Sequence, residues 1–322
     1  MEYKKCCLFG LKSKTKLFEL LKIDNKKYYK QSFVASKINP FLTNKNRLVE
    51  APKKQLKTYQ NRIFNMLKKI EIPDNIFCGQ KGKSYIDNSK MHLENSNMFK
   101  VDISKFYPSI SRDRIYRFFK NDLSTSPDVA EILTNFATID LNLKNQKSKA
   151  MIDVNAFLVK KNISCRNHLI TGSPFGALLS YFVNLDLYNE LQDYADKNNL
   201  LMTAYIDDIA FSSNGKISGV MQKNILNIIR KHHYEINKTK CKYYGNGIPK
   251  RLTGGIITKN KSIDAQNKLI KRANQISLDL KRGKSFTEKE IQNAYGLIAA
   301  IEMTDRKMPQ LKKRLKEERK QI

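Results

Sequence analysis

Two adjacent aspartates, Asp207 and Asp208, lie between two short runs of apolar, β-branched, aromatic and small residues. These runs, Leu201–Tyr205 and Ile209–Ser213, have the composition of half-buried strands, so we expect a hairpin with both carboxylates at its turn. Aspartate is common in turns for reasons unrelated to function. A carboxylate pair that faces a third acid can instead hold two Mg²⁺ ions for phosphoryl transfer. The sequence therefore predicts chemistry here only if it supplies that third acid.

The chain carries such an acid upstream of the pair. Asp102 ends an apolar stretch that is predicted to be a strand, and the aromatic residues Phe106 and Tyr107 follow it closely. We therefore treat Asp102, Asp207 and Asp208 as the candidate catalytic and metal-ligating residues.

The whole chain is strongly basic. Its 322 residues include 60 Lys and Arg against 30 Asp and Glu, a formal net charge of +30. So much charge of one sign repels itself, and a polyanion such as nucleic acid would relieve that repulsion. No apolar run approaches the ~20 residues of a membrane-spanning helix, so we expect no membrane association and a cytoplasmic location. The five cysteines form no C-x-x-C pair, which argues against a zinc module or a disulfide framework.

The segments around these acids predict mainly helices. Residues 1–40 are expected to form short basic helices, and residues 41–51 a strand. Pro52 is expected to open an amphipathic helix. A further helix is predicted at about 128–138, and a polar stretch rich in Lys and Asn follows over 142–168. We interpret that stretch as an excursion from the core that could contact nucleic acid.

A loop that enters a helix is predicted over residues 169–176. Gly172 would permit a close approach, Ser173 would cap the helix and Pro174 would occupy its first position. Such a helix start suits a phosphate or a template backbone. Together with the strands and the hairpin, these helices predict an α+β fold with the carboxylates on one sheet face.

The last part of the chain has a helical pattern. One apolar stripe is closed by Gly283, and Thr287 with Glu290 offers a capping box for the next helix. The segment 311–316 has a narrow apolar seam and a dense basic face, which predicts a helix that is either solvated or in contact with nucleic acid.

These motifs, taken in chain order, resemble those of reverse transcriptases, and most closely those of bacterial retron reverse transcriptases. The segments that resemble general family motifs are Phe99–Tyr107, Thr171–Pro174, Tyr205–Asp208 and Ile236–Lys240. Two others, Asn88–His92 and Leu252–Gly254, are similar to retron signatures. The resemblance runs from about Lys45 to about Thr304, and Thr171 stands where the family usually has glutamine.

The resemblance implies a right-hand polymerase with an α+β fold. Residues 1–40 would form a basic N-terminal helical extension, and residues 41–257 the fingers and palm, with parts of the fingers in 41–98 and about 111–185. Residues 258–322 would form an α-helical thumb.

The resemblance also implies roles for individual residues. Asp102 and Asp207 would bridge two Mg²⁺ ions, with Asp208 as an auxiliary acid, and Tyr107 would exclude ribonucleotides by contact with their 2′-OH. The implied nucleotide-binding residues are Arg47, Tyr107, Gly172 and Lys240. The implied RNA- or template-binding residues are Asn88, His92, Thr171, Thr253 and Gly254.

A retron enzyme is expected to bind its own structured noncoding RNA and to use dNTPs. It would begin synthesis at a guanosine 2′-OH, yield an RNA-linked DNA and act in phage defence with a separately encoded effector. The alternatives are another defence-associated or group II intron-like reverse transcriptase, an RNA-dependent RNA polymerase, and a non-catalytic RNA-binding module. An aromatic gate at Tyr107 would select dNTPs, which argues against an RNA-dependent RNA polymerase. A non-catalytic RNA-binding module would leave three acids in a basic chain unexplained, since unpaired buried carboxylates are costly.

Overall fold

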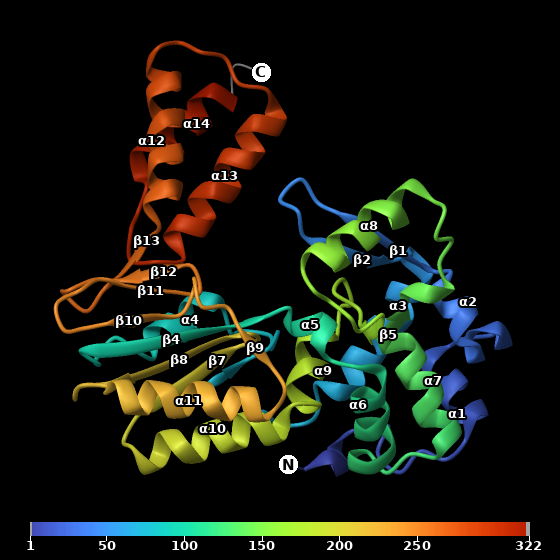
Figure 1. Cartoon of the computed structure of the whole chain (residues 1–322). Coiled ribbons are helices and arrows are strands. Elements are labelled where there is room, and N and C mark those ends of the chain that lie inside the picture. The colour runs from blue at the N-terminus through green and yellow to red at the C-terminus, as the bar shows by residue number, and fades with distance from the viewer. Residues whose placement is uncertain (1, 320–322) are drawn as a thin grey trace. The chain divides into compact units, whose positions relative to one another are not determined.

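The computed structural model describes residues 2–319, so Met1 and residues 320–322 lie outside the described part. The chain divides into two compact units (Figure 1). Unit 1 comprises Met1–Lys81, Ile103–Leu191 and Asn227–Ile236, and unit 2 comprises Gly82–Asp102, Gln192–Leu226 and Asn237–Ile322. Helices and antiparallel strands occur in both, which confirms the predicted α+β class. No helix among residues 2–319 is both long and apolar enough to cross a bilayer.

Unit 1 starts with the short helices that the sequence predicts. They are η1 (Tyr3–Lys5), α1 (Lys14–Leu21), η2 (Lys26–Tyr29) and α2 (Gln31–Ala35). The Ser13 hydroxyl caps α1 by accepting a hydrogen bond from the Lys16 amide. Tyr28 of η2 is fully buried and stacks on Phe136 with a centroid distance of 5.7 Å, which anchors this segment in the core of the unit.

The next segment is a hairpin, not the single strand predicted over 41–51. β1 (Ile38–Leu42) pairs antiparallel with β2 (Leu48–Pro52). The chain reverses between them, where Asn46 adopts a left-handed φ of +52° that asparagine tolerates. Because Pro52 still pairs with Ile38, the following helix α3 (Lys54–Leu67) begins two residues after the predicted start.

The rest of unit 1 is largely helical and includes the predicted helix at about 128–138, observed as α7. The elements are β3 (Ile76–Phe77), α5 (Phe106–Ser109), α6 (Arg112–Arg117), η3 (Phe118–Asp122), α7 (Pro127–Ala137), β5 (Thr138–Asp140), η4 (Leu141–Leu143), α8 (Lys149–Lys160), β6 (Asn167–Leu169) and α9 (Gly176–Phe182). The polar stretch 142–168 thus contains a helix, α8, which lies beside the β1–β2 hairpin (Figure 1). β5 and β6 pair antiparallel.

Unit 2 is built on antiparallel strands in the order β10-β4-β8-β7. Their bounds are β4 (Asn97–Ser104), β7 (Leu201–Tyr205), β8 (Asp208–Ser213) and β10 (Lys242–Tyr244). The end of β4 also pairs with β9 (Glu235–Ile236). Helices α10 (Leu185–Lys197) and α11 (Gly219–Lys231) flank the β7–β8 hairpin in sequence, and α4 (Tyr85–Lys90) precedes β4.

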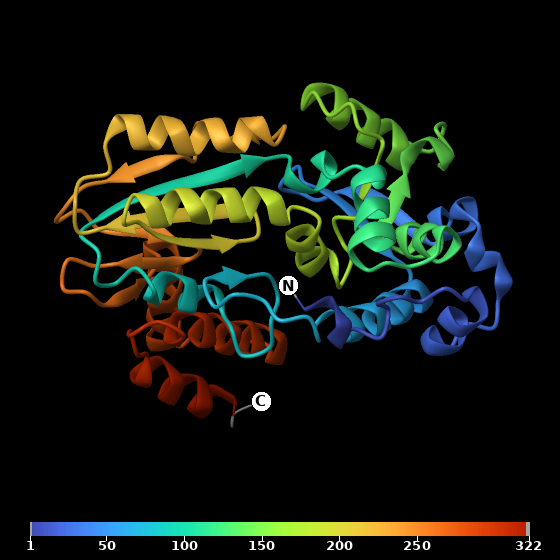
Figure 2. The same cartoon turned by 90° about the horizontal axis from the view of Figure 1, so that it is seen from below.

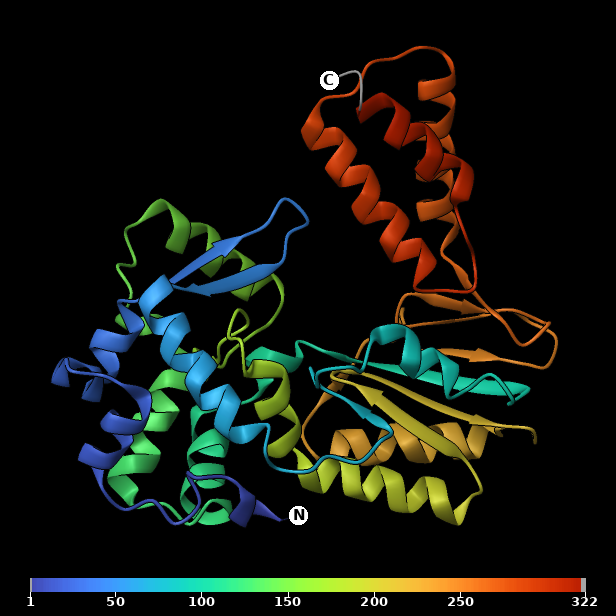
Figure 3. The same ribbon diagram turned by 180° about the vertical axis from the view of Figure 1, so that it is seen from behind.

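A small sheet and a helical bundle complete unit 2. β11 (Lys250–Leu252), β12 (Gly255–Ile257) and β13 (Ile263–Ala265) form the sheet, and α4 lies beside it (Figure 3). The helices α12 (Asn267–Lys281), α13 (Glu288–Glu302) and α14 (Pro309–Arg319), red and orange in Figure 2, share one apolar core. Gly283 ends α12 with a φ of +74°, and Thr287 with Glu290 forms the predicted capping box.

Candidate active site

Strand pairing brings the three acids together in unit 2. Asp102 on β4 lies directly opposite Asp208, the first residue of β8. Asp207 occupies the two-residue turn between β7 and β8, next to Ile206, whose φ is +58°. A left-handed conformation is unfavourable for a β-branched residue, so the surrounding sheet must hold this turn in place. The structure thus has the hairpin and the neighbouring third acid that the sequence predicts.

The three carboxylates lie in a partly desolvated, mutually repulsive group. Burial, followed by the charge of Asp102, raises the pKa of Asp207 to about 6. Burial also raises the pKa of Asp208, although Lys100 opposes this effect. Like charges that are this close resist ionisation together unless cations accompany them.

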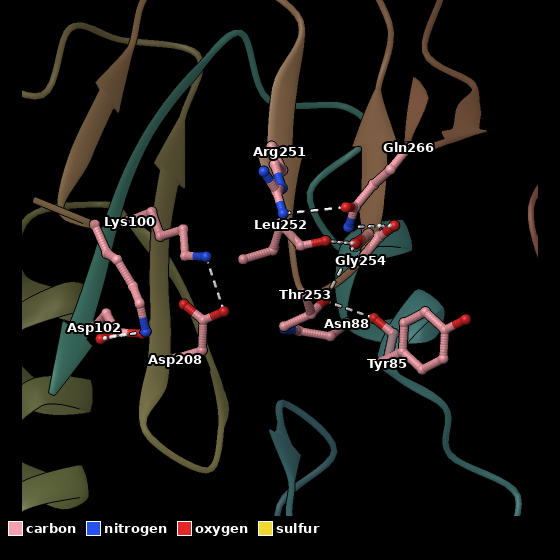
Figure 4. A network of polar contacts seen from close by, with 12 residues as sticks. Tyr85, Asn88, Lys100, Asp102, Asp208, Arg251, Leu252, Thr253, Gly254 and Gln266 are labelled. Carbon is pink, nitrogen blue, oxygen red and sulfur yellow. Dashed lines mark hydrogen bonds and ion pairs between the residues drawn. The ribbon is translucent and has the colours of Figure 1, made fainter. Parts of the chain in front are cut away.

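Two lysines supply positive charge to this group, and Figure 4 labels one of them, Lys100, beside Asp208. The Lys240 ammonium contacts both carboxylate oxygens of Asp102, at 3.1 and 2.9 Å. The Lys100 ammonium lies 2.9 Å from Asp208 Oδ2. Lys100 was not among the predicted site residues, although its position two residues before Asp102 places both side chains on the same face of β4.

The donor set suits a divalent cation. Among residues 2–319 no three acidic, His or Cys side chains stand as a preformed metal site. The ammonium groups of Lys100 and Lys240 lie against Asp208 and Asp102. Asp208 Oδ1 is nevertheless buried with no hydrogen-bond partner in this described part of the chain. Carboxylate oxygens are the ligands that Mg²⁺ prefers. The Lys240 side chain is 56% exposed and can therefore turn away from Asp102.

The two segments that resemble retron signatures pack directly against each other in unit 2 (Figure 4). Thr253 donates its hydroxyl proton to the Tyr85 carbonyl at 2.6 Å, and Asn88 Nδ2 lies 3.4 Å from the same hydroxyl. Gly254 has a φ of +121°, and a Cβ there would lie 2.8 Å from the Tyr85 ring. The Thr253–Gly254 turn therefore fits α4 only with glycine at the second position.

His92 and Asn88 are fully buried, and their role in binding RNA or template stays a prediction. His92 lies between two hydroxyls, with Nδ1 2.6 Å from Ser212 Oγ and Nε2 2.7 Å from Thr203 Oγ1. It therefore connects the segment after α4 to β7 and β8, the hairpin that carries Asp207 and Asp208. Burial lowers its pKa to about 3, which leaves the ring neutral.

Among the predicted site residues of unit 1, Gly172 and Tyr107 lie at or beside the turn over residues 171–175. A Cβ at Gly172 would lie 2.5 Å from the Glu50 carbonyl oxygen, so only glycine allows this approach to β2. The Tyr107 ring lies beside the start of α9, 3.1 Å from the position of a Cβ at Gly176. Arg47 is exposed on the β1–β2 hairpin. These positions leave their nucleotide-binding roles as predictions.

The predicted helix cap in this turn is wrong. α9 begins at Gly176, and its N-cap is Phe175, not Ser173. The Gly176 amide donates to the Ser173 carbonyl, because residues 171–175 form irregular turns before the helix starts. The buried Ser173 hydroxyl has no hydrogen-bond partner among residues 2–319.

A buried pair next to this turn was not predicted from the sequence. Glu50 and His168 are both fully buried, and Glu50 Oε1 lies 2.8 Å from His168 Nε2. Glu50 and Leu48 are two residues apart on β2 and both lie on its buried face. An acid on the buried face of a strand is the signal that could have identified it.

Comparison with known proteins agrees with these observations. Residues 26–263 match the family model described as reverse transcriptase (RNA-dependent DNA polymerase). The Retron Se72 reverse transcriptase of Salmonella heidelberg (strain 579083-10) is 26% identical over 65% of this chain and 50% of its own length. The Retron Ec83 reverse transcriptase of Escherichia coli is 21% identical over 78% of this chain and 77% of its own. The chain thus spans half the length of the Se72 enzyme.

A solved foamy viral protease-reverse transcriptase in complex with double-stranded DNA has 13% identity and a TM-score of 0.40, over 81% of this chain and 35% of its own. The family model covers more than half of the chain, and members of that family have the right-hand polymerase fold and generally use divalent metal ions. The chain therefore belongs to the reverse transcriptase (RNA-dependent DNA polymerase) family, and its retron relatives confirm the resemblance to the retron type.

Proposed function

We propose that this protein is an RNA-directed DNA polymerase of the retron type. It binds a cognate structured noncoding RNA and synthesises an RNA-linked single-stranded DNA from a guanosine 2′-OH. The observation that carries the proposal is the pairing of Asp102 with Asp208 across β4 and β8, with Asp207 beside them, in a chain of this family. The net charge of +30 suits a nucleic-acid substrate.

Asp102 and Asp207 are the proposed ligands of two Mg²⁺ ions, and Asp208 is an auxiliary acid. When bound, these ions would activate the primer hydroxyl and stabilise the charge on the leaving pyrophosphate. The raised pKa of Asp207 supports this assignment, because a carboxylate that repels its neighbours gains most from a nearby cation. Lys100 would keep Asp208 oriented through its ion pair.

Lys240 has two positions in this proposal. The Lys240 ammonium group neutralises Asp102 in this structure, and its side chain is 56% exposed. If Asp102 held a divalent cation, Lys240 would be repelled and would turn toward the phosphates of the incoming nucleotide. Lys240 is thus both a counter-ion of the acid and a nucleotide-binding residue.

The remaining assignments concern the substrates. Arg47, Tyr107 and Gly172 would bind the incoming dNTP, with the Tyr107 ring excluding the ribonucleotide 2′-OH. Thr171, Thr253 and Gly254 would contact RNA or template, and the buried Asn88 and His92 would belong to the same binding region. Residues 41–257 would carry fingers and palm, after a basic extension over 1–40, and α12–α14 would form the thumb. A role in phage defence with a separately encoded effector completes the proposal.

The decisive experiment supplies the purified protein with the noncoding RNA encoded beside its gene, Mg²⁺ and dNTPs. We expect a DNA product that resists RNase but remains attached to RNA at one nucleotide. Asp207→Asn should abolish synthesis, while the matched change Asp264→Asn, at an ion pair with Arg306, should not. Full synthesis by Asp207→Asn would contradict the proposal.

The nucleotide gate is tested separately. Tyr107→Ala should let the enzyme incorporate ribonucleotides, which is measured by primer extension with each NTP and dNTP, and Tyr107→Phe should keep the discrimination. Unchanged discrimination in Tyr107→Ala would remove Tyr107 from this role.

A further inference from the structure

One buried ion pair in unit 1 has no part in the chemistry described so far. Glu50 on β2 and His168 on β6 have no exposed surface, and their side chains meet at 2.8 Å. The other ring nitrogen of His168, Nδ1, lies 2.8 Å from the Cys165 carbonyl oxygen. With Glu50 ionised, both neighbours of the imidazole are hydrogen-bond acceptors, so each ring nitrogen carries a proton and the ring is a cation paired with the Glu50 carboxylate.

The polar groups of Glu50 are directed at the turn that carries Gly172. Glu50 Oε2 accepts a hydrogen bond from the Thr171 amide at 3.1 Å, and the Glu50 amide donates to Thr171 Oγ1 at 2.9 Å. The Glu50 carbonyl oxygen fills the space that a side chain at Gly172 would need. Residues 50 and 171 are therefore joined by two reciprocal hydrogen bonds, with the backbones in contact.

His168 is connected to the same turn through the chain. It lies on β6, three residues before Thr171, and β6 leads directly into the turn. Glu50 is the third residue of β2 and follows Arg47 by three residues in the chain. The hairpin that carries Arg47 is therefore tied to the turn through this pair. The hydroxyl of Thr171 is used in this connection, which gives a reason for threonine where the family usually has glutamine.

We propose that the Glu50–His168 ion pair positions the Thr171–Gly172 turn against the Arg47 hairpin, and so sets the geometry in which the incoming nucleotide binds. The inference rests on the proposed function, because Arg47 and Gly172 bind a nucleotide only there. The pair does not touch the nucleotide. Well-packed apolar side chains would stabilise a fold as well as a buried ion pair does, whereas the charged pair fixes direction and distance.

The test is steady-state synthesis of DNA on poly(rA) primed with oligo(dT), with dTTP varied. In Glu50→Gln the new amide group is a donor and must face either the Thr171 amide or the protonated His168 nitrogen, so one of the two bonds is lost. We expect the KM for dTTP to rise about tenfold, with kcat changed less than about twofold, because a displaced binding group weakens substrate binding.

The matched control is Glu131→Gln, which removes a carboxylate from another ion pair of unit 1, the one with Arg112. Its KM for dTTP should stay within about twofold of the wild-type value. Circular dichroism and a thermal melt at the assay pH establish that each variant is folded at the assay temperature.

A second pair of variants keeps the ion pair and changes only the turn. Thr171→Val removes the acceptor for the Glu50 amide, and Thr171→Ser retains it. We expect a KM for dTTP several-fold higher in Thr171→Val and restored in Thr171→Ser. These two variants decide the question if Glu50→Gln does not fold.

The outcomes separate this inference from the function on which it rests. Absence of synthesis by the wild-type protein contradicts the proposed polymerase. A normal wild-type rate, with unchanged KM values in the folded Glu50 and Thr171 variants, overturns the positioning role alone. A fall in kcat with unchanged KM in these variants also overturns it.

Discussion

The two units each bury one histidine completely, and one of the two rings is a cation whereas the other is neutral. His168 in unit 1 lies between the Glu50 carboxylate and the Cys165 carbonyl. His92 in unit 2 lies between the hydroxyls of Ser212 and Thr203. Burial lowers the pKa of both rings, and it lowers that of His92 to about 3. In His168 the Glu50 charge and the Cys165 carbonyl outweigh burial and raise the pKa to about 10.

The partner, and not the extent of burial, therefore sets the charge of a buried histidine. A hydroxyl can donate or accept, so the Ser212 and Thr203 hydroxyls satisfy a neutral ring with one donor and one acceptor nitrogen. A carboxylate and a carbonyl can only accept, so they require two N–H groups. His92 therefore joins strands as a neutral bridge, whereas His168 joins them as half of an ion pair.

The largest expected effect comes from removing the cation of the charged pair. His168→Leu strands the Glu50 carboxylate in the core, and we expect the free energy of unfolding to fall by about 3 to 5 kcal/mol. Urea denaturation followed by circular dichroism measures it. The double variant Glu50→Leu with His168→Leu should recover part of the loss, because no charge is then left unpaired. A loss below about 1 kcal/mol in the single variant would show that the ring is not a buried cation.

Removing the neutral His92 ring should lower the free energy of unfolding less than removing His168. His92→Leu leaves the Thr203 and Ser212 hydroxyls without the ring but strands no charge, so we expect a loss of about 1 to 3 kcal/mol in the same urea experiment. Adding Thr203→Val, which replaces one orphaned hydroxyl by a methyl group, should recover part of it. If His92→Leu destabilises the protein more than His168→Leu, the ranking of charged and neutral bridges is wrong.

Structural features could be predicted from the sequence where the pattern that indicates them lies within one short segment. Apolar, β-branched and aromatic composition predicted the strands around Asp207 and the strand that ends near Asp102, and strand pairing places Asp102 opposite Asp208. The capping box of Thr287 and Glu290 was equally local and is present. The α+β class followed from the order of such elements.

The sequence was insufficient where a contact joins distant segments. Lys240 on Asp102 and His168 on Glu50 each depend on tertiary register, which has no signature in the neighbouring residues. His92 lies in a polar, basic segment of the sequence, which suggests a surface position. It is nevertheless buried, and the hydroxyls of Thr203 on β7 and Ser212 on β8 are the hydrogen-bond partners of its ring. The β1–β2 turn contains neither glycine nor proline, so the two strands were predicted as one.

The pH dependence of stability should show the two histidines as opposite slopes. Between pH 3 and 6.5 the unfolded chain protonates His92 while the folded chain does not, so stability falls as the pH falls. Between pH 6.5 and 10 the folded chain keeps the His168 proton that the unfolded chain loses. The stabilisation from His168 is therefore fully present below pH 6.5 and is lost as the pH rises.

Each slope can reach about 1.4 kcal/mol per pH unit, and unfolding in urea at a series of pH values measures them. His92→Leu should flatten the acid limb and leave the alkaline limb unchanged. The double variant Glu50→Leu with His168→Leu should do the reverse. If both variants flatten the same limb, or neither flattens any, the two rings do not differ in charge, because only a group whose proton affinity changes on folding contributes a slope.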